Sequence, residues 1–132
     1  MAARTLAGRL VSAFGDPEAM ARFYAPEVRW HMESKGQWPD PIAGKEAVIA
    51  FNRDVWTIFY EPDCTVEILD EVEDEAGSAV RFAYRAFAKV PNQPYENEYS
   101  VFVRKGPQGI TDVFERFDTT VVAQFYAGVR RG

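Results

Sequence analysis

The first part of the chain places apolar side chains at helical spacing. Between residues 6 and 14 they recur every three or four positions, which predicts an amphipathic helix that ends near Gly15. A second helix is predicted to begin at residues 16–18, Asp-Pro-Glu. Asp caps helices, Pro suits the first helical position, and Glu favours the positive end of the helix dipole. We expect this helix to include Tyr24 and to stop before Pro26.

The period of the pattern then falls to two. Residues 28–32 alternate, which predicts a strand with Trp30 on one face and His31 on the other. Residues 34–42 contain one Gly and two Pro, which is typical of a loop. Helical spacing returns at residues 44–59, so a third helix is expected there.

Beyond residue 62 the chain alternates apolar and polar side chains in segments joined by turns. The predicted strands lie at about residues 65–72, 80–87, 95–104 and 110–118. Consecutive strands with short connections pair antiparallel. Residues 119–128 are expected to add a short C-terminal helix, capped by Asp118 or Thr119. This order of elements predicts one α+β domain over residues 1–132, with its helices packed against a mainly antiparallel sheet.

Glu115 breaks the apolar pattern of the last predicted strand. With a period of two it lies between Val113 and Phe117 on one face. Burial raises the pKa of a carboxyl group, and a pKa near neutrality suits general acid or base catalysis. Alternatively, Glu115 forms a structural ion pair with Arg81 or Arg85, which lowers its pKa. Glu115 is therefore the first catalytic candidate, and its surroundings decide between these two roles.

Two further residues are candidates for proton transfer. His31, the only histidine, is either an acid/base partner at a strand end or a half-exposed residue opposite Trp30. Glu98 alternates with Tyr99, and this alternation alone indicates that Glu98 faces solvent and that the tyrosine face is buried. A slip of one residue or a bulge would reverse that assignment.

Aromatic side chains are unusually abundant. They make up 14% of the chain, which is more ring surface than a small core needs, so we expect some of them to line an apolar cavity or an interface rather than plain core. The residues expected at its wall, as a substrate-binding set, are Trp30, Met32, Trp56, Phe82, Tyr84, Val113 and Phe117. The hydroxyl of Tyr84 is a candidate hydrogen-bond donor to a ligand oxygen.

Charge and cysteine content exclude several classes of protein. The net charge of −5 argues against nucleic-acid binding, which normally requires a basic patch. No apolar stretch approaches the roughly 20 residues of a membrane span, and no signal peptide is apparent. The single cysteine, Cys64, cannot form an internal disulfide, so we expect a cytoplasmic protein. One His and one Cys match no metal-ligand spacing, and we expect neither metal nor cofactor.

Three segments, together with the order of the elements, resemble a known family. They are FYAPEVRW at 23–30, AGKEAV at 43–48 and GITDVFERFD at 109–118. In this order they resemble the NTF2-like superfamily, and in particular its SnoaL-like branch. That superfamily includes polyketide cyclases, ketosteroid isomerases and limonene-epoxide hydrolases. The resemblance implies a cystatin-like cone, in which helices pack in a strongly curved sheet.

The same resemblance assigns roles to single residues. It places Glu115 where the cyclases and epoxide hydrolases have a catalytic aspartate. It places Met32 at the position of the isomerase base and Ser100 near that of the isomerase acid, and neither side chain suits the isomerase role. It also turns Glu98 toward the cavity, in conflict with the alternation of its strand.

Taken together, these features predict a cofactor-independent isomerase, cyclase or hydrolase. It binds a hydrophobic small molecule, uses Glu115 as acid or base, and forms a homodimer through the outer face of its sheet. The alternative is a non-catalytic ligand-binding or dimerisation module with Glu115 in a structural ion pair. An unpaired carboxyl group in the interior favours the enzyme, and a bidentate arginine contact favours the module.

Overall fold

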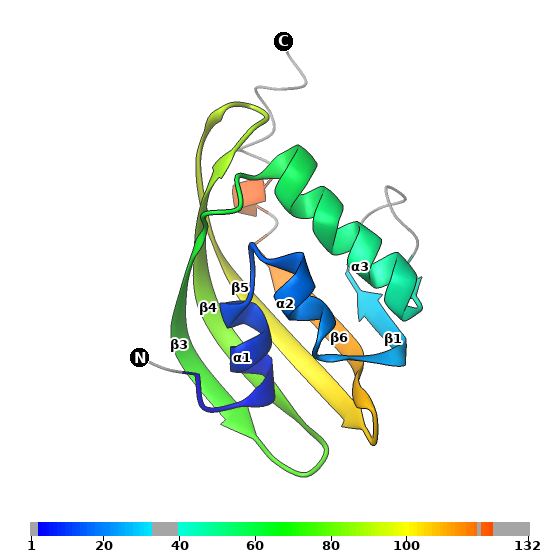
Figure 1. The fold of residues 1–132 in the computed structure, drawn as a ribbon. Coiled ribbons are helices and arrows are strands. Elements are labelled where there is room, and N and C mark those ends of the chain that lie inside the picture. Colours follow the sequence, from blue (N-terminus) through cyan, green and yellow to red (C-terminus); the bar gives the residue numbers. More distant parts are fainter. Residues whose placement is uncertain (1–2, 33–39, 119, 123–132) are drawn as a thin grey trace.

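The chain folds around one curved, six-stranded sheet, and its helices lie together on one side of that sheet (Figure 1). The computed structural model describes residues 3–32, 40–118 and 120–122. The strand order is β2-β1-β6-β5-β4-β3, and every neighbouring pair is antiparallel except β1 and β6, which are parallel. The predicted α+β architecture is confirmed, and the parallel pair explains why the sheet is mainly rather than entirely antiparallel.

The helices are short, and side chains cap the first two of them. They are α1 (Leu6–Ser12), α2 (Pro17–Ala21) and α3 (Lys45–Asp54), and α3 continues into one wider π-type turn, η1 (Val55–Phe59). The hydroxyl of Thr5 accepts a hydrogen bond from the Gly8 amide, and Asp16 accepts one from the Ala19 amide. These contacts satisfy amides at the helix starts, as the sequence predicts for Asp16.

The second helix ends earlier than predicted. It stops at Ala21, and Tyr24 already belongs to the first strand. The physical reason is Pro26, which disfavours helical backbone in the residue before it and cannot donate to a helix ladder. In the strand, Pro26 lies where the register between β1 and β6 shifts, a position that tolerates the missing donor.

The strands follow the predicted alternation closely. They are β1 (Tyr24–His31), β2 (Ile42–Ala43), β3 (Thr65–Glu73), β4 (Gly77–Ala88), β5 (Gln93–Gly106) and β6 (Gly109–Phe117). The two-residue strand β2 was not predicted, because two residues carry no period. In β5, Tyr95, Val101 and Val103 are buried, whereas Glu98 is exposed. The alternation of β5 therefore gives the correct orientation, and the orientation of Glu98 implied by the resemblance is wrong.

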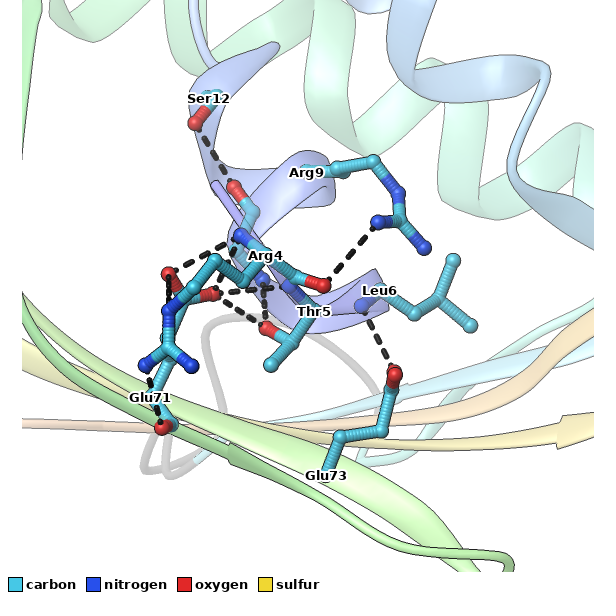
Figure 2. A network of polar contacts seen from close by, with 8 residues as sticks. Arg4, Thr5, Leu6, Arg9, Ser12, Glu71 and Glu73 are labelled. Carbon is cyan, nitrogen blue, oxygen red and sulfur yellow. Dashed lines mark hydrogen bonds and ion pairs between the residues drawn. The ribbon is translucent and has the colours of Figure 1, made fainter. Parts of the chain in front are cut away.

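A bulge in β3 fixes the position of α1. The register between β3 and β4 shifts between Ile68 and Asp70, and beyond this point Glu71 and Glu73 point toward α1 (Figure 2). Glu71 accepts hydrogen bonds from the Thr5 hydroxyl at 2.7 Å and from the Thr5 amide at 2.9 Å. Glu73 accepts one from the Leu6 amide at 2.9 Å. The hydrogen bond from the Thr5 hydroxyl is the main reason that the pKa of Glu71 is lowered. Two carboxylates of β3 thus hold the start of α1 against the sheet.

The predicted C-terminal helix lies largely outside the described residues. Residues 120–122 are helical, and Asp118 caps them by accepting hydrogen bonds from the Thr120 and Val121 amides. Most of the predicted loop at 34–42 also lies outside the described part. Within residues 3–32, 40–118 and 120–122, no helix has the length and apolar character needed to cross a membrane.

Candidate functional site

Glu115 lies near the middle of the sheet, on the face that the helices cover. We call this the inner face and the opposite one the outer face. Strand β6, which carries Glu115, runs between β1 and β5. Val101 of β5 pairs directly with Glu115, and Trp30 of β1 pairs with the neighbouring Val113. Only 9% of the surface of Glu115 is exposed, so its carboxyl group is enclosed by apolar side chains, as predicted.

The carboxyl group of Glu115 has few polar partners. The indole Nε1 of Trp30 donates to its Oε1 at 3.5 Å, and Oε2 has no hydrogen-bond partner in the described part of the chain. Arg116 lies beside it in sequence, but its guanidinium donates to the main-chain carbonyl of Glu115. The carboxyl group therefore has one long hydrogen bond and no cation among the described residues.

The predicted ion pair of Glu115 with Arg81 or Arg85 is wrong. Both arginines lie on the outer face, where other carboxylates already pair with them. Arg81 bridges Asp70 and Glu98, and Arg85 bridges Glu67 and Glu96. A period of two places residues 81 and 85 opposite the buried Phe82 and Tyr84. The alternation of this strand therefore predicts that both arginines face away from Glu115.

Burial dominates the electrostatics of this site. Loss of solvation raises the pKa of Glu115 from its ordinary 4.5 to about 7, and the hydrogen bond from Trp30 opposes this rise only in part. Burial also raises the pKa of Tyr24 and of Tyr99, with a smaller contribution from the charge of Glu115 in each case. The two phenols are therefore close enough to Glu115 to interact with it electrostatically, and both stay protonated at neutral pH.

Aromatic rings surround this part of the inner face. The Tyr99 ring stacks on Phe82, with ring centroids 5.6 Å apart, and meets Phe117 at 5.5 Å. Trp30 contacts Tyr24 edge-on. Of the predicted substrate-binding set, five residues are buried on this side of the sheet and two are half-buried: Trp30, Trp56, Phe82, Tyr84 and Val113, then Met32 and Phe117. Their role as the wall of a substrate cavity stays a prediction.

Several polar groups of the interior were not predicted as site residues. The Tyr24 hydroxyl donates to Oδ1 of Asn52, which is 1% exposed. The hydroxyls of Tyr95 and Tyr99 are 3.0 Å apart, and Asn97 donates to Tyr95 at 2.9 Å. The sequence could have predicted that Asn52 is buried, because it follows Val48 by four residues and so lies on the apolar face of the third helix.

Tyr84 is less available than the sequence suggested. Its hydroxyl accepts a hydrogen bond from Trp56 Nε1 at 2.8 Å and interacts with the thiol of Cys64. Burial is the main reason that the pKa of Cys64 is raised, so its thiol is a poor nucleophile at neutral pH. Tyr84 therefore belongs to a polar contact that joins β4 to Trp56 of η1 and to Cys64, just before β3.

The structure does not bring His31 or Glu98 to Glu115. The His31 Nε2 lies 3.0 Å from Oδ1 of Asp112, and its ring stacks on Phe114 at 4.2 Å. Glu98 pairs with Arg81 at 2.8 Å. Both side chains lie on the outer face, so they cannot share a substrate with Glu115. Among the described residues, no group of three or more His, Cys, Asp or Glu side chains is placed to hold a metal ion.

Comparison with solved structures finds many similar folds, 312 chains in all. An NTF2-like protein of unknown function from Burkholderia pseudomallei K96243 has a TM-score of 0.74 and 22% identity, over 91% of this chain and 93% of that one. A presumed SnoaL-like polyketide cyclase from Jannaschia sp. CCS1 has a TM-score of 0.72 and 14% identity, over 91% and 90%.

A third similar structure is a hypothetical protein with a ketosteroid isomerase-like fold from Catenulispora acidiphila DSM 44928, in complex with trimethylamine. Its TM-score is 0.71 and its identity 14%, over 89% of this chain and 92% of that one. At these identities the comparisons show the fold alone. A search of curated proteins finds no significant sequence match. The sequence profile of the SnoaL-like domain family matches residues 9–111, most of the chain, and the protein therefore belongs to this family, with an NTF2-like fold.

Proposed function

We propose that this protein binds a hydrophobic small molecule against the inner face of its sheet and that Glu115 exchanges a proton with it. One observation carries this proposal: Glu115 is a buried carboxyl group with one long hydrogen bond and no cation among the described residues. With a pKa of about 7, roughly half of these groups are protonated at neutral pH. Glu115 therefore suits either direction of proton transfer.

The apolar surroundings favour a substrate with a large hydrocarbon or aromatic body. The rings of Phe82, Tyr99 and Phe117 provide contact area for such a body. The name of the Jannaschia protein points toward cyclisation of polyketides. Isomerisation and cyclisation can both begin with proton transfer between Glu115 and the substrate, and we propose this step without choosing between them.

Hydrogen–deuterium exchange at carbon acids tests the proposal without knowledge of the natural substrate. Cyclic ketones and 1,3-diketones are incubated with the protein in D2O, and loss of the α-proton signal is followed by NMR. We expect the protein to accelerate exchange of at least one compound. The Glu115→Gln variant should lose about 10²–10⁴-fold of this rate, whereas Glu96→Gln on the outer face should retain it. Equal rates for the wild type and Glu115→Gln would refute the proposal.

We also propose that the protein is a homodimer through the outer face. Phe102 and Phe114 lie half-buried there with ring centroids 6.1 Å apart, and Arg104 lies 5.5 Å from the Phe114 centroid. Aromatic residues and Arg are common at protein interfaces. Light scattering should give about twice the chain mass of 15.0 kDa.

A charge introduced into this patch tests the interface. Phe114→Glu should reduce the mass to that of one chain, because it removes an aromatic ring from the contact and replaces it with a charged group that has to be desolvated there. Ile58→Glu is the matched control, since Ile58 is exposed and lies in η1, on the helical side of the sheet. A monomeric wild type would contradict the dimer.

A further inference from the structure

Among the described residues, no cation pairs with the carboxyl group of Glu115 on the inner face. Of the described ion pairs, those of Arg81 and Arg85 lie on the outer face, and Arg53 pairs with Glu18 where both side chains are exposed. Arg4 pairs with Glu71 at the start of α1. None of these cations reaches Glu115. Ionisation of Glu115 therefore places an uncompensated charge in an apolar interior, which is costly unless a countercharge arrives from elsewhere.

The groups next to Glu115 favour a cation as that countercharge. Tyr24 on β1 and Tyr99 on β5 are the titratable groups that sense its charge, and both remain neutral near pH 7. Tyr99 lies against Phe117, two residues from Glu115 on the same strand face. The faces of aromatic rings carry negative potential and attract cations, most strongly where water is excluded.

The free oxygen of Glu115 gives a cation a place to bind. Oε1 already accepts a hydrogen bond from Trp30, and Oε2 has no partner in the described part of the chain. Glu115 keeps 9% of its surface exposed, so the residue is not completely closed off from solvent. An anionic ligand would instead place a second negative charge beside Glu115, and a neutral ligand would leave the carboxyl group protonated.

We propose that the hydrophobic ligand of this site carries a positively charged nitrogen, an amine or a quaternary ammonium group, that pairs with Glu115. This inference rests on the ligand site proposed above and adds the chemistry of the ligand's head group. An aliphatic tertiary amine is already protonated at neutral pH, so it binds as an ammonium ion whose N–H donates to Glu115, and the carboxyl proton of Glu115 is released to solvent. A quaternary ammonium ion has no lone pair, and its binding releases the proton of Glu115 to solvent.

Three probes of nearly the same shape separate charge from hydrophobicity. They are choline, the neutral 3,3-dimethylbutan-1-ol and the anionic 3,3-dimethylbutanoate, titrated into the full chain by calorimetry at pH 8. We expect choline to bind at least about tenfold more tightly than the alcohol, because a partly desolvated ion pair and ring contacts contribute more than about 1.4 kcal/mol. The carboxylate should not bind measurably.

Two variants test whether Glu115 causes the preference for choline over the neutral alcohol. In Glu115→Gln the affinity for choline should fall to that of the alcohol, while the alcohol is bound as before. Glu96→Gln, which also removes one carboxylate but on the outer face, should leave the choline affinity unchanged. Circular dichroism of each variant shows whether it is folded. Loss of choline binding in both variants would assign the effect to net charge and overturn the proposal.

Proton release and pH dependence give a second, independent readout. With a pKa of about 7, choline binding at pH 7 should release about half a proton, measured by calorimetry in buffers of different ionisation enthalpy. The affinity should fall about tenfold between pH 8 and pH 6. Absence of any choline preference overturns this inference. In that case the proposed function still stands if the alcohol binds or if carbon-acid exchange depends on Glu115, and only the charge of the ligand is wrong.

Discussion

The buried carboxyl group of Glu115 should make the protein less stable as pH rises. In the unfolded chain its pKa is near the ordinary 4.5, and in the folded protein burial raises it to about 7. Because the folded pKa is the higher one, the native state favours the protonated form. The stabilisation is complete below pH 4.5 and is lost as pH rises through about 7.

The size of this effect follows from the two pKa values. One pKa unit corresponds to about 1.4 kcal/mol, so a rise from 4.5 to about 7 amounts to about 3 kcal/mol between acid and alkaline pH. Gln has nearly the shape of protonated Glu and carries no charge. We therefore expect Glu115→Gln to match the wild type within about 1 kcal/mol at pH 4.5 and to exceed it by about 2–3 kcal/mol at pH 8.

Urea unfolding at several pH values, followed by circular dichroism, measures this difference. Every other titrating group is common to both proteins, so the difference in unfolding free energy isolates residue 115. Glu96→Gln is the control, and its difference from the wild type should change little with pH because its ion pair is exposed. A pH-independent difference for Glu115→Gln, or a variant less stable than the wild type at pH 8, would refute the reasoning.

Three further predictions concern contacts elsewhere in the structure that stabilise the fold. Glu71→Gln should lower the unfolding free energy by about 1–3 kcal/mol at pH 7, because it weakens charged hydrogen bonds to Thr5. Since the pKa of Glu71 is lowered, this loss should shrink as pH falls in urea unfolding, and Glu75→Gln should show no such loss. Trp56→Phe should cost about 1–2 kcal/mol by the same assay, because Tyr84 loses its donor. Gly109→Ala should lower the thermal midpoint and cost about 1–3 kcal/mol, since Gly109 has a φ of 128°; an unchanged midpoint would contradict it.

Periodicity predicted the strands because one face of the sheet is buried and the other is not. Val101, Val103 and Val113 are buried while Glu98 is exposed, and such a contrast fixes a strand's orientation. The same contrast predicts Glu115 inside and Arg81 outside. The pattern was therefore a better guide to Glu98 than the family resemblance, which does not record the register of this particular chain.

Other features depend on contacts that no local pattern encodes. The bulge near Leu69 reverses the direction of Glu71, and only the docked α1 explains why this carboxylate points inward. The pairing of Tyr95 with Tyr99 and of Tyr24 with Asn52 joins residues whose hydroxyl and amide groups meet only in the folded protein. Sequence reasoning located the faces of the sheet, and it could not assign these partners.

The carboxyl group of Glu115 makes few polar contacts within the described part of the fold. Its only described hydrogen bond through the carboxyl group is the long one to Trp30, and it neutralises no described cation. Above neutral pH its charge costs stability, whereas a Gln or an apolar residue would not. Proteins commonly carry such destabilising groups at sites where activity or binding requires them. We propose that a ligand that brings a positive charge to Glu115 offsets the cost of its ionised form, which links the effect of Glu115 on stability to its proposed chemistry.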